Sequence, residues 1–227
     1  MESFVSGSEN CLVLSVSIPK PSFDQQKPLP VIVWIHGGGF TQGSGDPSMY
    51  GPDRFMDYDV IVVNINYRLG PFGFLSSGTD KIPGNQGIWD QIQALKWVQK
   101  NIAAFGGDPN QVTIMGESAG SMSVMSLYVS KESKGLFQKA IAQSGTTNGA
   151  FTTSYLHPKC ALEKIAKNVN CDTDDLECLQ NASTEDIGKV QVEWQSVFAN
   201  EGYHHTLYKL IDDSKFSSNP IFTKGMS

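Results

Sequence analysis

The sequence is short of basic side chains, of cysteines and of long apolar runs, and each shortage excludes a class of protein. Its 227 residues carry 17 lysines and arginines against 23 aspartates and glutamates, a formal net charge of −6. Binding to nucleic acid needs a basic stripe that displaces counterions from phosphates, so this charge balance argues against nucleic acid as a partner. No stretch approaches the roughly 18 apolar residues of a membrane span, so we expect no span.

The cysteines are too few and too scattered for a zinc site. They are Cys11, Cys160, Cys171 and Cys178. None forms a CxxC pair or a cysteine–histidine cluster with zinc spacing, so we expect no metal site and no cofactor. Cys171 and Cys178 are near enough in sequence to close a small loop in an oxidising compartment, and four buried or idle thiols are the alternative.

Signals that would place the chain in a compartment point in two directions. The first residues, Met1–Val5, have no basic start and no apolar segment, so they do not resemble a signal peptide and, taken literally, predict a cytosolic chain. Asn181-Ala182-Ser183 is an acceptor triplet for N-glycosylation, although such triplets also arise by chance.

The order of apolar patterns predicts an α/β fold. Val31–Ile35 and Val60–Ile65 are continuous apolar runs, typical of strands covered on both faces. Further strands are predicted at 11–18 and 112–115, with 140–142 as another candidate. Apolar residues at helical spacing follow the second run, at Ile88, Ile92, Leu95, Val98, Ile102 and Phe105. Buried strands that alternate with such helices predict a mainly parallel sheet with helices on both faces.

The glycines and the polarity divide the chain into two regions. Of the 22 glycines, 18 lie between Gly37 and Gly149, so tight turns are concentrated there. We expect the sheet core in residues 8–150. Residues 151–227 are more polar and show short helical patterns near 162–169, 176–179 and 185–194. We interpret them as a helical excursion from a single, partial domain.

A G-x-S-x-G sequence, Gly116–Gly120, carries the clearest chemical signal. It follows the strand predicted at 112–115 and precedes a helical pattern, which is the context of a nucleophile elbow with Ser118 at its tip. Side chains two residues before and after the serine would collide in so tight a turn, which explains Gly116 and Gly120. The alternative is an ordinary glycine-rich turn in which the serine caps the helix.

A second glycine cluster, His36-Gly37-Gly38-Gly39-Phe40, follows the strand at 31–35. Three glycines there are explained if backbone N–H groups must approach a ligand closely, such as the oxyanion formed in acyl transfer. In proteins with a nucleophile elbow, a further donor to the oxyanion is the backbone N–H of the residue that follows the nucleophile, here Ala119. A phosphate cradle is the competing interpretation, but no Lys-Ser/Thr follows and no helix begins at Gly39.

The histidines do not supply an obvious base. In proteins with a nucleophile elbow, the catalytic histidine follows the serine and the acid in the chain. Because His36 precedes Ser118, we expect it to order the glycine loop by hydrogen bonding and not to act as the base. His157, His204 and His205 follow Ser118, but no clear strand precedes the His204-His205 pair. A surface or core histidine is the simpler interpretation of His204 and of His205.

These motifs together resemble the type-B carboxylesterases, a family of α/β hydrolases that includes cholinesterases, insect esterases and bile-salt-activated lipase. The resemblance is carried by Glu9–Pro19, apart from departures at three positions, by Val31–Phe40 and by Phe105–Gly120. It is nearly continuous from Ser8 to about Ala150 and becomes sparse beyond Phe151.

The resemblance implies a role for each site residue. Ser118 would accept the acyl group of a small-molecule ester, and the N–H groups of Gly38, Gly39 and Ala119 would form the oxyanion hole. Glu117 would lie near the site floor and Phe151 would be an aromatic wall of the acyl pocket. Cys171 and Cys178 would pair as a disulfide. On the basis of its own triplet, and not of the resemblance, Asn181 is expected to be glycosylated. A full-length form would be secreted or resident in the lumen of the endoplasmic reticulum.

The resemblance also implies that residues are missing. Family members are more than twice as long, and neither their triad acid nor their triad histidine has a counterpart among the 109 residues that follow Ser118. We therefore expect the fold to be incomplete at both ends and this chain to be a poor enzyme by itself. Two alternatives stay open, a non-catalytic adhesion or binding protein on the same fold and a truncated, inactive isoform. Nothing in the sequence predicts an oligomeric state.

Overall fold

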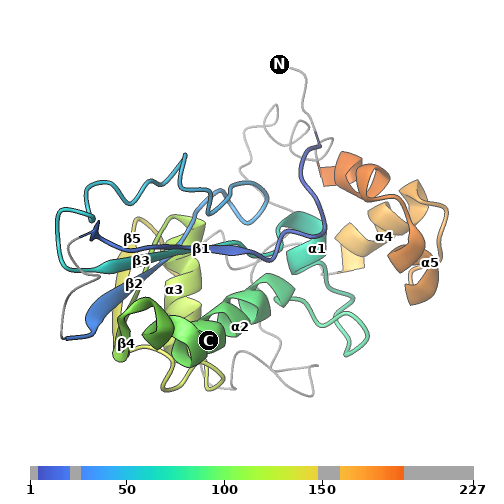
Figure 1. Ribbon diagram of the computed structural model, residues 1–227. Coiled ribbons are helices and arrows are strands. Elements are labelled where there is room, and N and C mark those ends of the chain that lie inside the picture. The colour runs from blue at the N-terminus through green and yellow to red at the C-terminus, as the bar shows by residue number, and fades with distance from the viewer. Residues whose placement is uncertain (1–4, 21–26, 148–158, 192–227) are drawn as a thin grey trace. The chain divides into compact units, whose positions relative to one another are not determined.

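The computed structural model describes residues 5–20, 27–147 and 159–191, and the chain divides into two compact units. Leu12–Tyr67 and Ile88–Thr147 make up the first, here called the sheet unit. Met1–Cys11, Arg68–Gly87 and Asn148–Ser227 make up the second, the helical unit. Figure 1 shows the strands of the first unit and the short helices of the second. The described part of the chain has no helix that is both long and apolar enough to cross a membrane.

The sheet has five strands in the order β1-β3-β2-β4-β5. They are β1 (Leu14–Ser17), β2 (Leu29–Ile35), β3 (Ile61–Ile65), β4 (Gly107–Glu117) and β5 (Lys139–Gln143). β1 is antiparallel to β3, and the other pairs are parallel. Every predicted strand segment therefore forms a strand. The first is shorter than expected, and β4 starts earlier because Gly107 pairs with Leu29 of β2.

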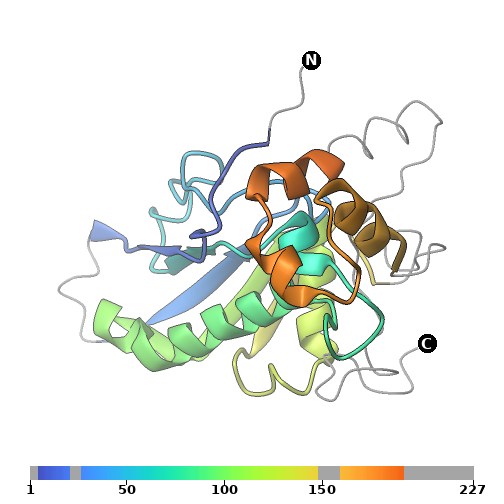
Figure 2. The same ribbon diagram turned by 90° about the vertical axis from the view of Figure 1, so that its right-hand side faces the viewer.

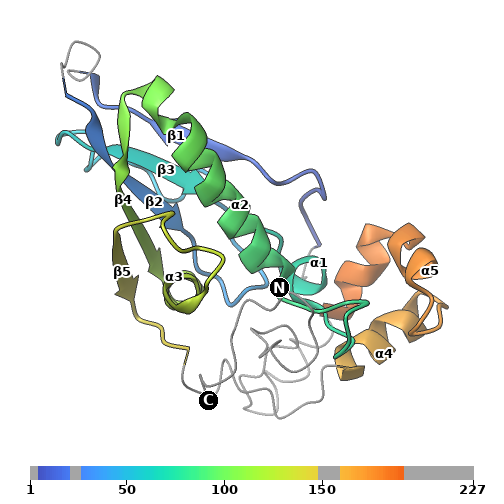
Figure 3. The ribbon, with the colours of Figure 1, turned by 90° about the horizontal axis from the view of Figure 1, so that it is seen from below.

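Both crossover helices cover the same face of this sheet. β3 connects to β4 through α2 (Gln86–Asn101), and β4 connects to β5 through α3 (Ala119–Val129). These connections cross the sheet in one direction, so right-handed crossovers place both helices on one side, as Figure 3 shows. The connection from β2 to β3 crosses in the opposite direction, and residues 36–60 lie over the other face without an α-helix (Figure 2).

The core lies on the helix side of the two central strands. Val31, Val33 and Ile35 of β2 alternate with half-buried residues and are inaccessible to solvent. Their partners on β3 are equally inaccessible, namely Ile61, Val63 and Ile65. Burying aliphatic side chains of this size is worth roughly 1.5–3 kcal/mol each. Both faces of the central strands are at least partly covered, so residues on both faces are apolar. This is why continuous apolar runs predicted these strands.

The apolar stripe of α2 is confirmed except at its end. Ile88, Ile92, Leu95, Val98 and Ile102 are all buried. The α-helix stops at Asn101 and continues as a 3₁₀ turn, Ile102–Phe105, which Gly106 terminates in a left-handed conformation at φ 81°. A 3₁₀ turn advances through more rotation per residue than an α-helix. Phe105 is therefore turned outward and is 37% exposed, so its assignment to the buried stripe was wrong.

The helical unit contains short helices, of which the sequence predicted all but the first. They are α1 (Gly70–Phe74), α4 (Lys159–Asn168) and α5 (Leu176–Asn181), followed by helical backbone at 184–191. α4 buries one face, formed by Ala161, Leu162, Ile165 and Ala166. The spacing of these residues is that of a helix with a single apolar side.

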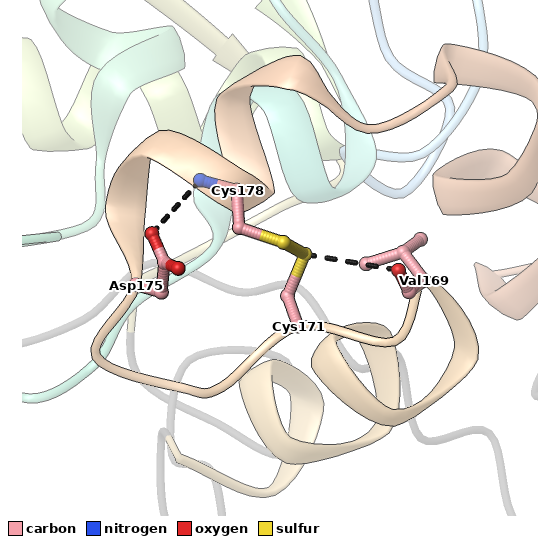
Figure 4. Close-up of a disulfide and its surroundings, with 4 residues drawn as sticks. All are labelled: Val169, Cys171, Asp175 and Cys178. Carbon is pink, nitrogen blue, oxygen red and sulfur yellow. Dashed lines mark hydrogen bonds between the residues drawn. A yellow bond between two sulfur atoms is a disulfide. The ribbon is translucent and has the colours of Figure 1, made fainter.

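A disulfide joins α5 to the segment that follows α4 (Figure 4). Cys171 and Cys178 are bonded, with their Cα atoms 5.8 Å apart, so the pairing implied by the resemblance is present. The Asp175 carboxylate caps α5 by accepting a hydrogen bond of 2.9 Å from the backbone N–H of Cys178. The same cysteine is thereby fixed through its backbone and through its side chain.

We expect the double replacement Cys171→Ser and Cys178→Ser to lower the free energy of unfolding by about 2–3 kcal/mol, because the bridge limits the unfolded chain by closing a short loop. Urea denaturation followed by far-UV circular dichroism measures the change. Cys160→Ser is the matched control, since Cys160 lies half-buried on α4 outside the disulfide. Equal unfolding midpoints for the double variant and the control would contradict a structural role for the bridge.

Candidate active site

Ser118 lies at a sharp turn between β4, which ends at Glu117, and α3, which begins at Ala119. Its backbone has φ 56° and ψ −119°, a conformation that non-glycine residues rarely adopt. Its side chain makes no hydrogen bond that caps α3. Ser118 is thus held in a strained turn without acting as an ordinary helix cap, and the nucleophile elbow is the better interpretation of the motif.

The two glycines of the motif permit close contact between the elbow and β2. A Cβ atom on Gly120 would overlap the carbonyl oxygen of Ile35, and one on Gly116 would overlap that of Gly120. Gly116 therefore excludes a side chain for the reason that the sequence suggested, crowding within the turn, whereas Gly120 excludes one because the backbone of β2 lies against it. The contact places the end of β2, where the second glycine cluster begins, directly against the serine turn.

β5 and the residues after it fix the other side of the elbow. The Ser118 N–H donates to the Gln143 carbonyl at 2.9 Å, and the buried Ser121 hydroxyl donates to the Gly145 carbonyl at 2.7 Å. A Cβ atom on Gly145 would overlap the Ser118 carbonyl oxygen. Sequence reasoning missed Ser121 and Gly145. The available signal was a serine one helical turn after the nucleophile and a glycine just after a strand.

The glycine loop after β2 lies against the serine. A Cβ atom on Gly37 would be 2.7 Å from the Glu117 carbonyl oxygen and 3.3 Å from the Ser118 Cβ atom. Gly38 and Gly39 have φ values of 107° and 63°, which favour glycine. The Gly38 carbonyl accepts hydrogen bonds from the N–H groups of the two residues after Phe40, both at 3.1 Å, which closes the loop.

Three backbone N–H groups in this region are available to a ligand. Within the described ranges, the N–H groups of Gly38, Gly39 and Ala119 donate to no carbonyl or side-chain acceptor. Ser118 itself is half-buried. Unsatisfied N–H donors beside a strained serine suit an oxygen that gains negative charge when the serine hydroxyl adds to a carbonyl.

His36 orders the loop, as the sequence led us to expect. Its imidazole is buried, and its Nδ1–H donates to the Gly37 carbonyl at 2.8 Å. The ring stacks on Tyr67 with centroids 4.5 Å apart, and the Tyr67 hydroxyl donates to the His36 carbonyl at 2.8 Å. A Cβ atom on Gly43 would be 2.5 Å from Nδ1. The imidazole is thus held by its own loop and by Tyr67, and among the described residues no hydrogen bond joins it to Ser118.

Burial determines the charge state of this pair. Desolvation lowers the pKa of His36, and the hydrogen bond to Gly37 opposes this change only in part. Burial also raises the pKa of Tyr67 far above its usual range, so its hydroxyl stays a donor. At neutral pH the loop is therefore supported by a neutral imidazole and a neutral phenol.

We expect His36 to make the protein less stable in mild acid. The unfolded histidine has a pKa of about 6.5, and the folded pKa lies lower. Between the two values only the unfolded chain is protonated, so the free energy of unfolding falls as pH is lowered, by up to about 1.4 kcal/mol per pH unit. Urea midpoints compared between the protein and His36→Gln from pH 7 to 4.5 measure the difference. Parallel pH curves for the two proteins would contradict this assignment.

The structure places the remaining predicted site residues as follows. Glu117 is the half-buried last residue of β4, and a Cβ atom on Gly37 would be 3.0 Å from its Oε2 atom. Asn181 is the exposed last residue of α5. Phe151, His157, His204 and His205 lie outside the described residues. In the ranges that are described, no group of three or more histidine, cysteine, aspartate or glutamate residues could hold a metal ion.

Residues 1–223 match the model of the carboxylesterase family. The chain is 41% identical to the juvenile hormone esterase of Tribolium castaneum over 223 residues, 95% of this chain and 37% of that protein. It is 40% identical to the acetylcholinesterase of Danio rerio over 221 residues, 94% of this chain and 34% of that protein. The chain thus spans little more than a third of these relatives.

Solved structures give the same result for the fold. The juvenile hormone esterase from Manduca sexta, crystallised with OTFP covalently attached, superimposes with a TM-score of 0.84 at 35% identity. The alignment covers 96% of this chain and 41% of that one. A thermophilic PNB esterase gives a TM-score of 0.80 at 36% identity, covering 94% of this chain and 44% of that one. The mixed sheet with its helices is therefore part of an α/β-hydrolase fold.

Proposed function

The chain belongs to the carboxylesterase family, and on this premise we propose that it hydrolyses carboxylic esters through an acyl-enzyme on Ser118. One observation carries the proposal. Ser118 occupies a strained turn in which its hydroxyl is not used as a helix cap, and a glycine loop packs directly against it. Packing alone does not explain a strained serine with a free hydroxyl, and both features suit nucleophilic attack on a carbonyl.

The reaction follows the usual two steps of acyl transfer. The Ser118 Oγ atom adds to the ester carbonyl carbon and gives its proton to a base. The carbonyl oxygen becomes an oxyanion, which the N–H groups of Gly38, Gly39 and Ala119 stabilise. Collapse of this intermediate breaks the bond to the alcohol oxygen, which leaves with a proton. Water then attacks the acyl-enzyme in the same way and releases the acid.

The base that accepts the proton does not come from the described histidine. His36 is engaged by Gly37 and Tyr67, and no described residue makes a hydrogen bond with the Ser118 hydroxyl. We infer that residues 1–227 expressed alone react slowly with a fluorophosphonate, and that the longest expressed form of the protein reacts quickly. Fast reaction of the 227 residues alone would contradict this inference and favour His204 or His205 as the base.

Two further residues have proposed roles in the substrate pocket. Glu117 adjoins the serine in sequence and contributes negative charge close to Gly37, so it would influence the electrostatic potential at the nucleophile. Phe151 would supply an aromatic wall for the acyl group. The substrate is a small-molecule ester. The relatives' names refer to juvenile hormone, acetylcholine and other esters, so they identify the reaction class and leave the alcohol and acyl groups open.

A binding protein without catalysis is the second candidate. One relative that is 44% identical over 191 residues, the "Crystal protein" of Dictyostelium discoideum, has a name that states no enzymatic activity. The intact serine elbow argues against loss of catalysis here. Reaction with a fluorophosphonate separates the candidates. A hydrolase is labelled at Ser118 and loses esterase activity in proportion to the fraction of Ser118 that is labelled. A longest expressed form that resists the reagent would favour the binding protein or an inactive isoform.

A further inference from the structure

Asn181 is the asparagine of a single glycosylation triplet. Of the twelve asparagines in the 227 residues, it alone is followed by a residue other than proline and then by serine or threonine. It is the last residue of α5, and its side chain is exposed. A carbohydrate attached to its amide nitrogen would therefore project into solvent without displacing any core residue of the helical unit.

The backbone around the triplet leaves the helix immediately after Asn181. Ala182 is extended, with φ −68° and ψ 153°. Ser183 starts the next helical segment, and its carbonyl accepts the N–H of Ile187 at 3.0 Å, while its hydroxyl accepts the N–H of Asp186 at 3.4 Å. The triplet thus forms a short, exposed connection between two helices, the kind of surface position at which a large polar group is tolerated.

The disulfide gives an independent indication of the compartment. Cys178 lies one turn before Asn181 on α5 and is bonded to Cys171 (Figure 4). Such bonds persist in the endoplasmic reticulum and outside the cell, and they are rare in the cytosol. N-glycosylation occurs in the same oxidising compartment. Exposure of the acceptor and the redox state of its neighbour therefore support the same conclusion from different observations.

We propose that Asn181 is a glycosylation site that carries an N-linked oligosaccharide. The donor is an oligosaccharide held on a lipid pyrophosphate. The Asn181 Nδ2 atom forms a bond to the anomeric carbon of the first sugar, the bond from that carbon to the pyrophosphate oxygen breaks, and the lipid pyrophosphate leaves. The amide loses one proton, and no electrons are exchanged with an oxidant or reductant. The inference is independent of the catalytic role of Ser118.

Expression through the secretory pathway of a eukaryotic cell tests the proposal. Mass spectrometry of the secreted protein should show one attached oligosaccharide. Peptide N-glycosidase F should remove it in a single step and convert residue 181 to aspartate. The tryptic peptide that contains Asn181 identifies the site. Mapping of the bond between Cys171 and Cys178 on the same sample shows that the protein passed through an oxidising compartment.

Matched variants separate glycosylation from folding. Asn181→Gln removes the acceptor, so we expect the mass decrease on treatment with peptide N-glycosidase F (the mass step) to disappear. Ser183→Thr keeps both the triplet and a side chain that caps the following helix, so we expect the mass step to remain. Asn168→Gln is a control outside the triplet that retains the step. A secreted protein with the disulfide closed and no carbohydrate at Asn181 would overturn the proposal, as would an unchanged mass step in Asn181→Gln.

Discussion

Ser118→Ala is expected to lower kcat for ester hydrolysis on the order of 10⁶-fold in the longest expressed form of the protein. Loss of the nucleophile alone removes nearly all of the acceleration that depends on the serine and its base, and leaves roughly 10³–10⁴ over water from binding and oxyanion stabilisation. The decrease in kcat is large because alanine has no Oγ atom to accept the acyl group. Steady-state hydrolysis of a p-nitrophenyl ester measures it.

The control for this variant is another serine on the same helix. Ser126 is buried on α3, where its hydroxyl donates to the Met122 carbonyl at 2.8 Å. Ser126→Ala removes one hydrogen bond with net worth of about 1 kcal/mol and should leave kcat within a few-fold of the parent value. Comparable activity in Ser118→Ala and Ser126→Ala would show that hydrolysis proceeds elsewhere in the molecule.

Gly38→Ala is expected to give the second largest effect, a loss of about 10²–10³ in kcat. A Cβ atom at this position would overlap the Gln42 carbonyl oxygen, and φ 107° is unfavourable for alanine. The loop must therefore shift, and at least one N–H group moves away from the oxyanion. Loss of one such donor typically costs 10²–10³ in rate. Because the donor acts mainly in the transition state, kcat should fall more than KM rises.

Gly135→Ala is the matched control for the loop variant. Gly135 also has a positive φ, 83°, but a Cβ atom there would meet nothing within 4 Å. Gly135→Ala therefore introduces alanine at an unfavourable positive φ but does not displace the glycine loop, so kcat should be unchanged. Equal kcat values for Gly38→Ala and the parent protein would contradict the assignment of this loop as the oxyanion hole.

The central strands could be predicted because both of their faces are covered. Val31–Ile35 and Ile61–Ile65 are apolar at nearly every position, so their pattern needs no knowledge of neighbouring elements. The first residues of β4 could not be predicted, since Gly107 belongs to the strand only through its pairing with Leu29. Phe105 follows the helical spacing in sequence, but the change to a 3₁₀ turn cannot be read from that spacing.

In the site, too, residues within a short motif could be predicted, but contacts between separate strands could not. Ser118, Gly38 and Gly39 could be singled out because a strained turn and N–H groups without a backbone acceptor require particular residues within a short motif. The contacts of Gly37 with Ser118, and of Gly145 with the Ser118 carbonyl, depend on the position of β4 between β2 and β5. Strand order is not contained in the local pattern, so these supporting residues become visible only in the folded chain.

Ser118 is proposed to carry the acyl group during hydrolysis. The most direct measurement combines rapid mixing of the longest expressed form with a p-nitrophenyl ester, acid quenching within the first turnover and mass spectrometry of the peptide that contains Ser118. We predict a burst of one equivalent of p-nitrophenol per active site, and one acyl group on Ser118 that is absent in Ser118→Ala. Hydrolysis without an acylated intermediate, or an acyl group on another residue, would contradict the account.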